Sequence, residues 1–526
     1  MSERAQRKLK PSLESLHRSF SRLSPGLLAI TALFVAGGCI AIPFVAATFP
    51  KMVDLPMHAA QTAVLRYYFE GRPDIRAQFE LHPLSNPYMS SYVLGALLMS
   101  VMPVLTAVRV ATALMLCWVP GGVATLAWGM KRSPLIGLAA VPLVFCELAS
   151  WGFINSLAAM GMLAAVIGLT LRLLDEPTKA RCIALGLLLV LLFFTHIFRF
   201  PLALAGIFAT TVVMTRDPRR WRPLLFPVAV ALALLVVFMV FRPPSMQAEA
   251  PELKLHTERL PEILLDVAGR EIDEKLAERL LDHAMLVLAL ASAAWGISHA
   301  KRREQSDDAR SFARRSLVAV GASIALSAFA YLILPWRMGT WAYVYPREAT
   351  MMTILALGMV PPLPREAWMR WVAVAALSVS SFRVVDRVAL QYGAFDARLE
   401  SFRIVAARIP PASKLCYLVF DREDPADIHV PAYVQAEKGG YLSFQFANFA
   451  HAPLHYRSDP EAVVPPIKPH LWEWNPEWFE VQRDGAFFDW FLIHSKRDPS
   501  DKLAADPTIV PVAHEGTWWL YVREGR

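Results

Sequence analysis

Residues 49–61 read FPKMVDLPMHAAQ and stand where the first long apolar stretch of the chain ends. Asp54 and His58 are about one helical turn apart in this segment, so a helix places both side chains on the same face. The segment therefore predicts a carboxylate and an imidazole that project together. Asp54 also suits the N-cap of a helix and Pro56 its first turn, and this structural role is compatible with a chemical one.

The composition around this segment is that of a membrane protein. The chain has 526 residues, of which 55% are hydrophobic, and its mean hydropathy is +0.37. Several apolar runs approach or exceed the roughly 18–20 residues that a helix needs to cross a bilayer. We therefore expect a polytopic α-helical membrane protein. No cleavable signal is expected, because no small-residue cleavage pattern follows the first apolar run.

The charged residues and cysteines exclude several classes of function. The net charge of +8 comes from Lys and Arg in short loops, with no basic face interleaved with aromatic residues. A nucleic-acid partner is therefore not expected. The 5 cysteines show no CxxC or zinc-ligand spacing, which argues against a disulfide framework and against a cysteine-based metal site.

The distribution of Lys and Arg predicts the topology. Residues 1–25 form a basic cytoplasmic N-terminus, 27–49 the first span and 50–88 an outer loop. Residues 89–104 are predicted as a short or half-inserted helix and 108–129 as an inward span, because two full crossings would leave Lys131-Arg132 outside. Including further segments, about 11–13 spans are expected; these segments lie near 134–150, 154–174, 182–197, 198–214, 223–241, 283–299, 316–334, 347–363 and 368–384.

Two domains follow from this pattern. Residues 26–385 form a transmembrane domain with outer loops 50–88 and 242–282. Within the second loop, apolar residues recur at helical spacing between 260 and 280, which predicts an amphipathic helix on the outer interface, with a solvated connector as the alternative. Residues 386–526 are predicted to form a small extracytoplasmic α/β domain, with short buried strands at 415–420, 488–493 and 518–522.

The unusual polar residues gather on the predicted outer side. Ionisable residues at helix ends in a membrane are costly and usually mark a substrate path. His196 and Arg199 share a helical face and suit a phosphate group, which Arg binds as a fork. Snorkelling of Arg199 and a satisfied core hydrogen bond at His196 are the structural alternatives. Glu80 and His82 lie in the same outer loop as Asp54.

A second polar segment, residues 336–348, combines aromatic residues with Arg337, Arg347 and Glu348. An interfacial aromatic belt accounts for its Trp and Tyr residues. It does not account for Arg347 at a predicted helix start, because a cation there opposes the helix dipole. A bound anion would remove this conflict. No glycine-rich phosphate-binding motif occurs in a suitable context.

The order of these features resembles the GT-C superfamily of membrane glycosyltransferases, which includes the protein O-mannosyl and aminoarabinose transferases. The features are a basic N-terminus and one span, an outer loop that opens with an acid, His82-Pro83, a short apolar helix, Arg109, and a span that ends in Lys131-Arg132. Four short motifs resemble a large uncharacterised bacterial branch of that superfamily: Asp54–His58, Gly152–Asn155, Phe194–His196 and Gly339–Arg347. Many members carry two consecutive acids in the first outer loop, whereas here Leu55 follows Asp54, which leaves the acceptor type open.

The resemblance implies a catalytic acid in the first outer loop, a role that falls on Asp54. The expected function is transfer of a sugar from a polyprenyl-phosphate donor to a lipid, glycan or protein acceptor at the outer face of a bacterial inner membrane. Asp54 would act as general base, and Arg347, Arg199 and His196 would stabilise the departing phosphate. Arg337 is a further substrate-binding candidate.

The remaining candidates and the rival functions stay open at this point. His58, Glu80 or His82 would orient the acceptor, or share a divalent metal ion with Asp54. One rival function is a transporter or flippase of a lipid-linked anion, which the lack of an internal repeat disfavours. A second rival is a non-catalytic membrane assembly factor with the same fold.

Overall fold

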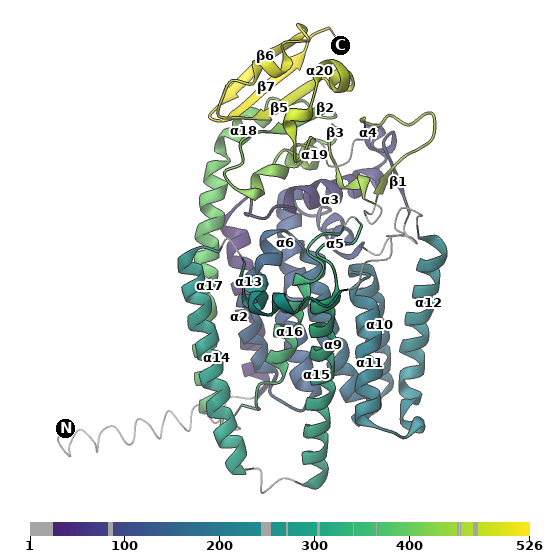
Figure 1. The fold of residues 1–526 in the computed structure, drawn as a ribbon, viewed down its shortest axis with the longest axis vertical. Helices are drawn as coiled ribbons and strands as arrows, with labels where there is room; N and C mark the ends of the chain where they lie inside the picture. The colour runs from purple at the N-terminus through teal and green to yellow at the C-terminus, as the bar shows by residue number, and fades with distance from the viewer. Residues whose placement is uncertain are drawn as a thin grey trace, which may run out of the picture.

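The computed structural model describes residues 25–82, 88–242, 254–269, 272–301, 306–339, 341–363, 366–449, 452, 454–466 and 472–525. The chain forms a bundle of long helices with a small strand-containing domain against one end, which we call the domain end (Figure 1). The predicted class, a polytopic α-helical membrane protein with a small C-terminal α/β domain, is confirmed. Residues 1–24 of the predicted basic N-terminus lie outside the described residues.

The helices of the bundle form where the sequence stays apolar over several turns. They are α2 (Pro25–Ala46), α5 (Ser90–Leu98), α6 (Val104–Leu116), α7 (Trp118–Gly129), α9 (Ile154–Asp175), α10 (Lys179–Thr195), α11 (Arg199–Met214), α12 (Leu225–Phe241), α14 (Glu274–Lys301), α15 (Asp307–Ile333), α16 (Pro346–Gly358) and α17 (Ala367–Arg398). In the described ranges, six helical stretches are long and apolar enough for a full crossing: Leu27–Ala46, Val104–Gly129, Ile154–Asp175, Pro218–Phe241, Glu274–Ile297 and Asp307–Ile333. The remaining predicted spans would have to be formed by shorter helices such as α10, α11 and α16, which have only 17, 16 and 13 residues.

The three elements predicted between 89 and 150 have different outcomes. The short helix expected at 89–104 is confirmed as α5, and α6 with α7 then gives one apolar stretch, Val104–Gly129, that is long enough to cross a bilayer. The span expected at 134–150 is wrong. That segment consists of the 3-10 turns η1 (Pro134–Ala140) and η2 (Pro142–Phe145) followed by α8 (Glu147–Ser150). Proline lacks the backbone N–H that a continuous helix needs, and both 3-10 turns begin with one.

The amphipathic helix predicted between 260 and 280 is also wrong as a single element. A short helix, α13 (Ile263–Ala268), ends at Gly269, whose φ of +113° is open to glycine at little cost. A Cβ atom at Gly269 would lie 2.6 Å from Oε2 of Glu147, so the chain also approaches α8 closely there. The long helix α14 then begins at Glu274, before the predicted span at 283. Residues 243–253 and 270–271 of this loop lie outside the described residues.

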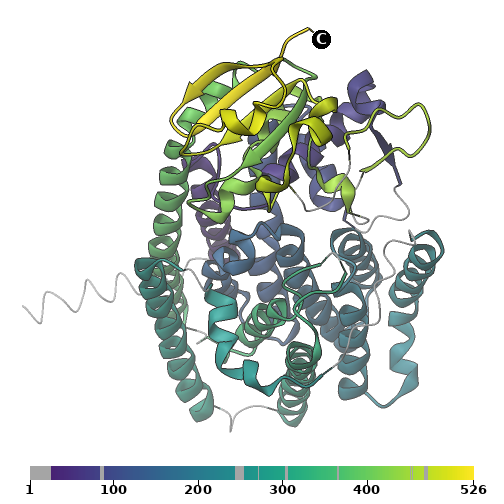
Figure 2. The same cartoon turned by 45° about the horizontal axis from the view of Figure 1, so that its top comes forward.

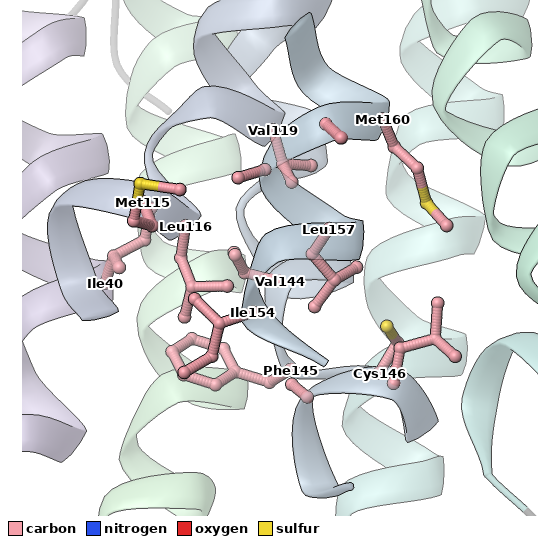
Figure 3. Packing of buried hydrophobic residues seen from close by; sticks show 14 of the residues in the cluster. Ile40, Met115, Leu116, Val119, Val144, Phe145, Cys146, Ile154, Leu157 and Met160 are labelled. Atoms are coloured by element: carbon pink, nitrogen blue, oxygen red, sulfur yellow. The ribbon is translucent and has the colours of Figure 1, made fainter. Parts of the chain in front are cut away.

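Close contacts between glycine residues hold the helices α7 and α9 of the bundle together. A Cβ atom at Gly122 of α7 would lie 2.0 Å from the carbonyl oxygen of Gly161 of α9, so only glycine fits there. Small residues of this kind let helices approach within a membrane. Figure 3 shows Val119 and Leu157 in the apolar packing around these two helices. This packing fixes α9, whose first residues border the candidate site.

The C-terminal domain contains a sheet of five strands in the order β3-β2-β5-β7-β6. The strands are β2 (Lys414–Val419), β3 (Tyr441–Leu442), β5 (Trp490–His494), β6 (Ile509–Glu515) and β7 (Trp518–Arg523). β2 pairs in parallel with β3 and β5, and β7 lies antiparallel between β5 and β6. The three predicted strands correspond to β2, β5 and β7. The predicted domain start at 386 lies within α17, which continues to Arg398 before α18 (Glu400–Ala406) begins.

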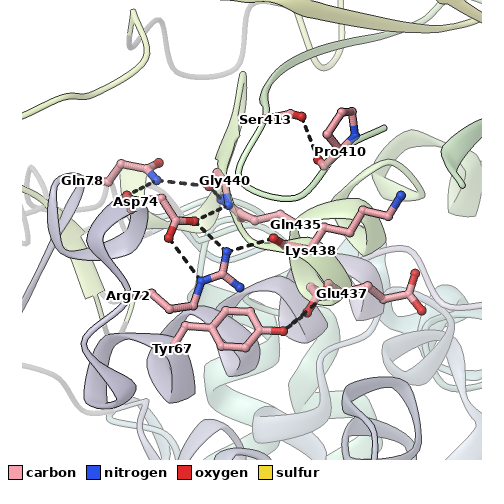
Figure 4. A network of polar contacts seen from close by, with 11 residues as sticks. Tyr67, Arg72, Asp74, Gln78, Pro410, Ser413, Gln435, Glu437, Lys438 and Gly440 are labelled. Atoms are coloured by element: carbon pink, nitrogen blue, oxygen red, sulfur yellow. Dashed lines mark hydrogen bonds and ion pairs between the residues drawn. The ribbon is translucent and has the colours of Figure 1, made fainter. Parts of the chain in front are cut away.

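The C-terminal domain is docked on the loop region that follows α2, residues 50–82 (Figure 2). In that loop, α3 (Leu55–Glu70) packs on α19 (Ala432–Lys438), and β1 (Phe79–Leu81) pairs antiparallel with β4 (Leu454–Tyr456). Figure 4 shows the polar contacts between the two parts. The carboxylate of Asp74 accepts a 2.8 Å hydrogen bond from the amide of Gly440, and Arg72 donates to the Lys438 carbonyl at 2.9 Å. These contacts place the domain directly over the segment that carries Asp54.

Candidate active site

A cavity of about 430 Å³ lies between the domain end of the bundle and the C-terminal domain. Its walls come from parts of the chain that are far apart in sequence. The residues that line it are Asp54, His58, Tyr88, Tyr92, Trp151, Phe153, Ile154, Asn155, Ser156, His196, Trp336, Arg337, Trp341, Ala342, Tyr343, Arg347, Phe446, Phe449, Ala452 and Trp474. Five of the eight predicted site residues therefore meet at one cavity: Asp54, His58, His196, Arg337 and Arg347.

Asp54 occupies the N-cap position of α3, but its side chain makes no capping hydrogen bond. The carboxylate instead faces the C-terminal domain, where its Oδ1 lies 3.6 Å from Nε2 of His429, and the side chain is 18% exposed. The backbone amide of Asp54 donates to the carbonyl of Trp151 at 3.1 Å, which fixes the start of α3 against the 151–156 segment. The capping role predicted for the Asp54 side chain is therefore absent, and its carboxylate is available to the cavity.

His58 and Gly152 support the position of Asp54. Nε2 of His58 lies 3.0 Å from the Gly152 carbonyl, and Nδ1 lies 2.8 Å from the Tyr92 hydroxyl. Because a carbonyl only accepts, Nε2 carries the proton and Nδ1 accepts from Tyr92. Gly152 has a φ of +87°, and a Cβ atom there would lie 2.9 Å from Cβ of Asp54. Burial lowers the pKa of His58 to about 4, so this histidine is a neutral side chain that orients the Gly152 turn.

Two residues that sequence reasoning missed complete the environment of Asp54. His429 ends the 3-10 turn η7 (Pro425–His429) of the C-terminal domain, and its Nε2 also lies 3.0 Å from Oε1 of Glu473. Both side chains are 3% exposed. Burial raises the pKa of Asp54 to about 7, although His429 acts in the opposite direction. No local pattern marks His429 or Glu473, because the docking of the domain alone brings them to Asp54.

Arg347, held against His196, forms the cationic wall of the cavity. Nη1 of Arg347 lies 3.1 Å from Nε2 of His196, and since a guanidinium only donates, this imidazole nitrogen accepts. The other guanidinium nitrogens donate to the carbonyls of Tyr343 and Ala342 at 3.1 and 3.0 Å. The guanidinium also lies 4.5 Å from the ring centre of Phe153. Arg347 is thus held rigidly at the cavity, with only 8% of its surface exposed.

The other predicted residues are placed differently. Arg199 is buried and pairs with Glu348 at 2.5 Å, and it does not line the cavity. Arg337 lies at the exposed rim, where its Nε donates to the Gly339 carbonyl at 3.1 Å. Glu80 and His82 pair with each other at 3.0 Å and also lie outside the cavity lining. The sequence alone could not show which candidates line the cavity, since all of them lie in segments that are predicted to be on the outer side.

The predicted metal-binding role has no matching set of ligands in the described part of the chain. Both ring nitrogens of His58 are occupied by Tyr92 and Gly152. Among the described residues, no group of three or more His, Cys, Asp or Glu side chains is arranged to hold a metal ion. The divalent ion that the sequence left open therefore stays a prediction.

The comparisons with known proteins concern the fold. No family model matches the sequence, and no curated protein matches it. Among solved structures, ArnT from Cupriavidus metallidurans bound to undecaprenyl phosphate matches with a TM-score of 0.52 and 13% identity, over 94% of this chain and 97% of that chain. The apo structure of the same protein matches with a TM-score of 0.48 and 14% identity, over the same shares. The chain therefore has an ArnT-like fold.

Proposed function

We propose that this chain is a glycosyltransferase of a bacterial inner membrane that moves a sugar from a polyprenyl-phosphate donor to a hydroxyl group of an acceptor. The observation that carries the proposal is the cavity itself, which has a largely buried carboxylate, Asp54, and a buried guanidinium, Arg347, in its walls. The shared fold with ArnT, whose crystal structure contains undecaprenyl phosphate, supports this choice of donor.

In this proposal the oxygen of the acceptor hydroxyl attacks the anomeric carbon of the sugar, while Asp54 accepts the proton of that hydroxyl. The bond between that carbon and the phosphate oxygen breaks, and polyprenyl phosphate leaves with the bonding electrons. A pKa near 7 suits a general base, because about half of the carboxylate is then ionised at neutral pH and it is basic enough to take a proton.

The opposite wall supplies the complementary charge. Negative charge grows on the phosphate as it leaves, and a guanidinium held in place by the Tyr343 and Ala342 carbonyls stabilises it without reorganising. Trp151, Trp341 and Phe153 provide flat apolar faces in the same cavity. Such faces pack against the C–H groups of a sugar or a prenyl chain.

Purified protein incubated with radiolabelled undecaprenyl-phosphate sugars and candidate lipid, glycan and protein acceptors tests the proposal. We expect acceptor-dependent release of undecaprenyl phosphate, abolished or strongly reduced in Asp54→Asn. The matched control is Glu80→Gln, which removes an acid from the same outer loop but outside the cavity lining. Equal losses in both variants would contradict the role of Asp54. If the protein moves the donor across the membrane of proteoliposomes but transfers no sugar, the chain acts as a flippase and not as a glycosyltransferase.

A further inference from the structure

The C-terminal domain contributes an imidazole, His429, and a carboxylate, Glu473, to the surroundings of Asp54, and neither residue lines the cavity. One nitrogen, Nε2 of His429, lies between two acids, 3.0 Å from Glu473 and 3.6 Å from Asp54. The imidazole stacks on Phe444, with ring centres 5.8 Å apart, and meets the edge of Phe446 at 5.9 Å. Charges in such apolar surroundings interact strongly, because little water screens them.

The turn that carries His429 is held firmly against the membrane domain. Asp427 closes a capping box with Asp424 at the start of η7, and its Oδ1 forms an ion pair with Nη2 of Arg398 of α17 at 2.7 Å. Asp424 in turn pairs with Lys51 at 2.5 Å, three positions before Asp54 in the chain. The same two segments are therefore joined twice, once by this pair and once by Asp54 with His429.

We propose that His429 and Glu473 are positioning residues that keep Asp54 ionised for catalysis, so that docking of the C-terminal domain completes the active site. The inference rests on the proposed function. Without the imidazolium, two buried carboxylates would face each other, and such a pair retains a proton because like charges in a buried site repel. With the imidazolium held by Glu473, Asp54 faces a cation and gives up its proton more readily.

The electrostatics of the cluster agree in sign with this role. Burial lowers the pKa of His429, but the Glu473 and Asp54 carboxylates outweigh it, and the net shift is upward, toward the charged imidazolium. For Asp54, burial raises the pKa, His429 lowers it, Glu473 raises it and Arg347 lowers it. His58 and Tyr92 also lie beside Asp54, and His58 is neutral because burial lowers its pKa. His429, 3.6 Å from Asp54, is therefore the group that lowers the pKa of Asp54 most, in a site where burial favours the protonated acid.

The pH dependence of transfer by the full-length protein tests this role, using undecaprenyl-phosphate sugar as the donor. A general base works when ionised, so the rate should rise with pH through the pKa of Asp54. In His429→Gln that rise should move by about 1–3 pH units to higher pH, since an opposite charge nearby lowers a carboxyl pKa by that amount. A shift of one unit lowers the ionised fraction at pH 7 from about one half to about one tenth. The rate at the high-pH plateau should be retained.

Two further variants separate this role from a structural one. His494→Gln removes another buried histidine of the same domain, on β5, and should leave the pH profile in place. The double variant His429→Gln with Glu473→Gln removes both charges of the pair. Its profile should return toward that of the parent, because an uncompensated anion no longer faces Asp54. If the pH profile of the double variant is shifted as far as that of His429→Gln, Glu473 has no part in the proposed role. An unshifted profile in His429→Gln would overturn the proposal.

A measurement without turnover distinguishes this inference from the proposed function. The C=O stretch of protonated Asp54 is observed by pH-difference infrared spectroscopy, and its assignment comes from its loss in Asp54→Asn. His429→Gln should shift the titration of this band to higher pH whether or not a sugar donor has been found. A shifted band without sugar transfer would contradict the proposed function alone, whereas an unshifted band in a folded variant would contradict the role of His429.

Discussion

Replacing Asp54 by Asn should lower activity and raise stability above neutral pH. Asn keeps the shape of the side chain but cannot accept the acceptor proton, so transfer should fall by about 10²–10⁴-fold. The usual loss of an N-cap does not apply, because the Asp54 side chain makes no capping hydrogen bond. Stability therefore depends on the charge of the carboxylate.

The magnitude follows from the pKa of this group. Its pKa is raised from 3.8 to about 7 in the folded protein, so the folded state holds the proton more tightly than the unfolded chain. The stability that this proton provides is fully present below pH 3.8 and is lost as pH rises to about 7. That loss amounts to at most about 4 kcal/mol. Asn has no such proton, and the loss of attraction to His429 offsets part of the gain.

Thermal unfolding of both proteins in one detergent, measured from pH 5 to pH 8 beside the transfer assay, checks this reasoning. The melting temperature of Asp54→Asn relative to the parent should increase as the pH rises. Asp54→Ala should follow the same trend, because no capping bond distinguishes Ala from Asn here. An Asn variant that transfers sugar at the parental rate would end the case for Asp54 as the base. A difference in melting temperature that does not change with pH would refute the raised pKa.

Three further predictions concern the turn, the cationic wall and the topology. Gly152→Ala should lower the melting temperature and slow transfer about 10²-fold, because its Cβ would push the catalytic carboxylate out of position; parental kinetics would show that the turn tolerates a side chain. Arg347→Ala should weaken binding of undecaprenyl phosphate in a direct binding assay, whereas Arg370→Ala, which does not line the cavity, should not; equal affinities would reduce Arg347 to a structural residue. Alkaline phosphatase should be active when fused at Arg526 and inactive when fused after Lys131, because the Lys and Arg bias predicts opposite compartments; activity at the second position would require another crossing in 89–129.

The fold class could be predicted from the sequence because membrane insertion is governed by local composition. A run of apolar residues has few alternatives to a helix in a bilayer. A strand whose consecutive residues are buried can likewise be recognised in the sequence as a short apolar run. The failures have local causes too. Prolines at 134 and 142 turn an apolar run into 3-10 turns, and Gly269 divides a segment whose apolar spacing is otherwise helical.

The sequence by itself determined the helical membrane class, the C-terminal domain and a short list of polar candidates headed by Asp54. Only the tertiary structure decided which candidates meet. It paired Arg199 with Glu348 away from the cavity and turned the Asp54 carboxylate away from helix capping. It also brought His429 and Glu473 to Asp54 across hundreds of residues. The physical reason is that a helix or a strand depends on neighbours in sequence, whereas the charge of a buried acid depends on whichever groups the fold packs against it.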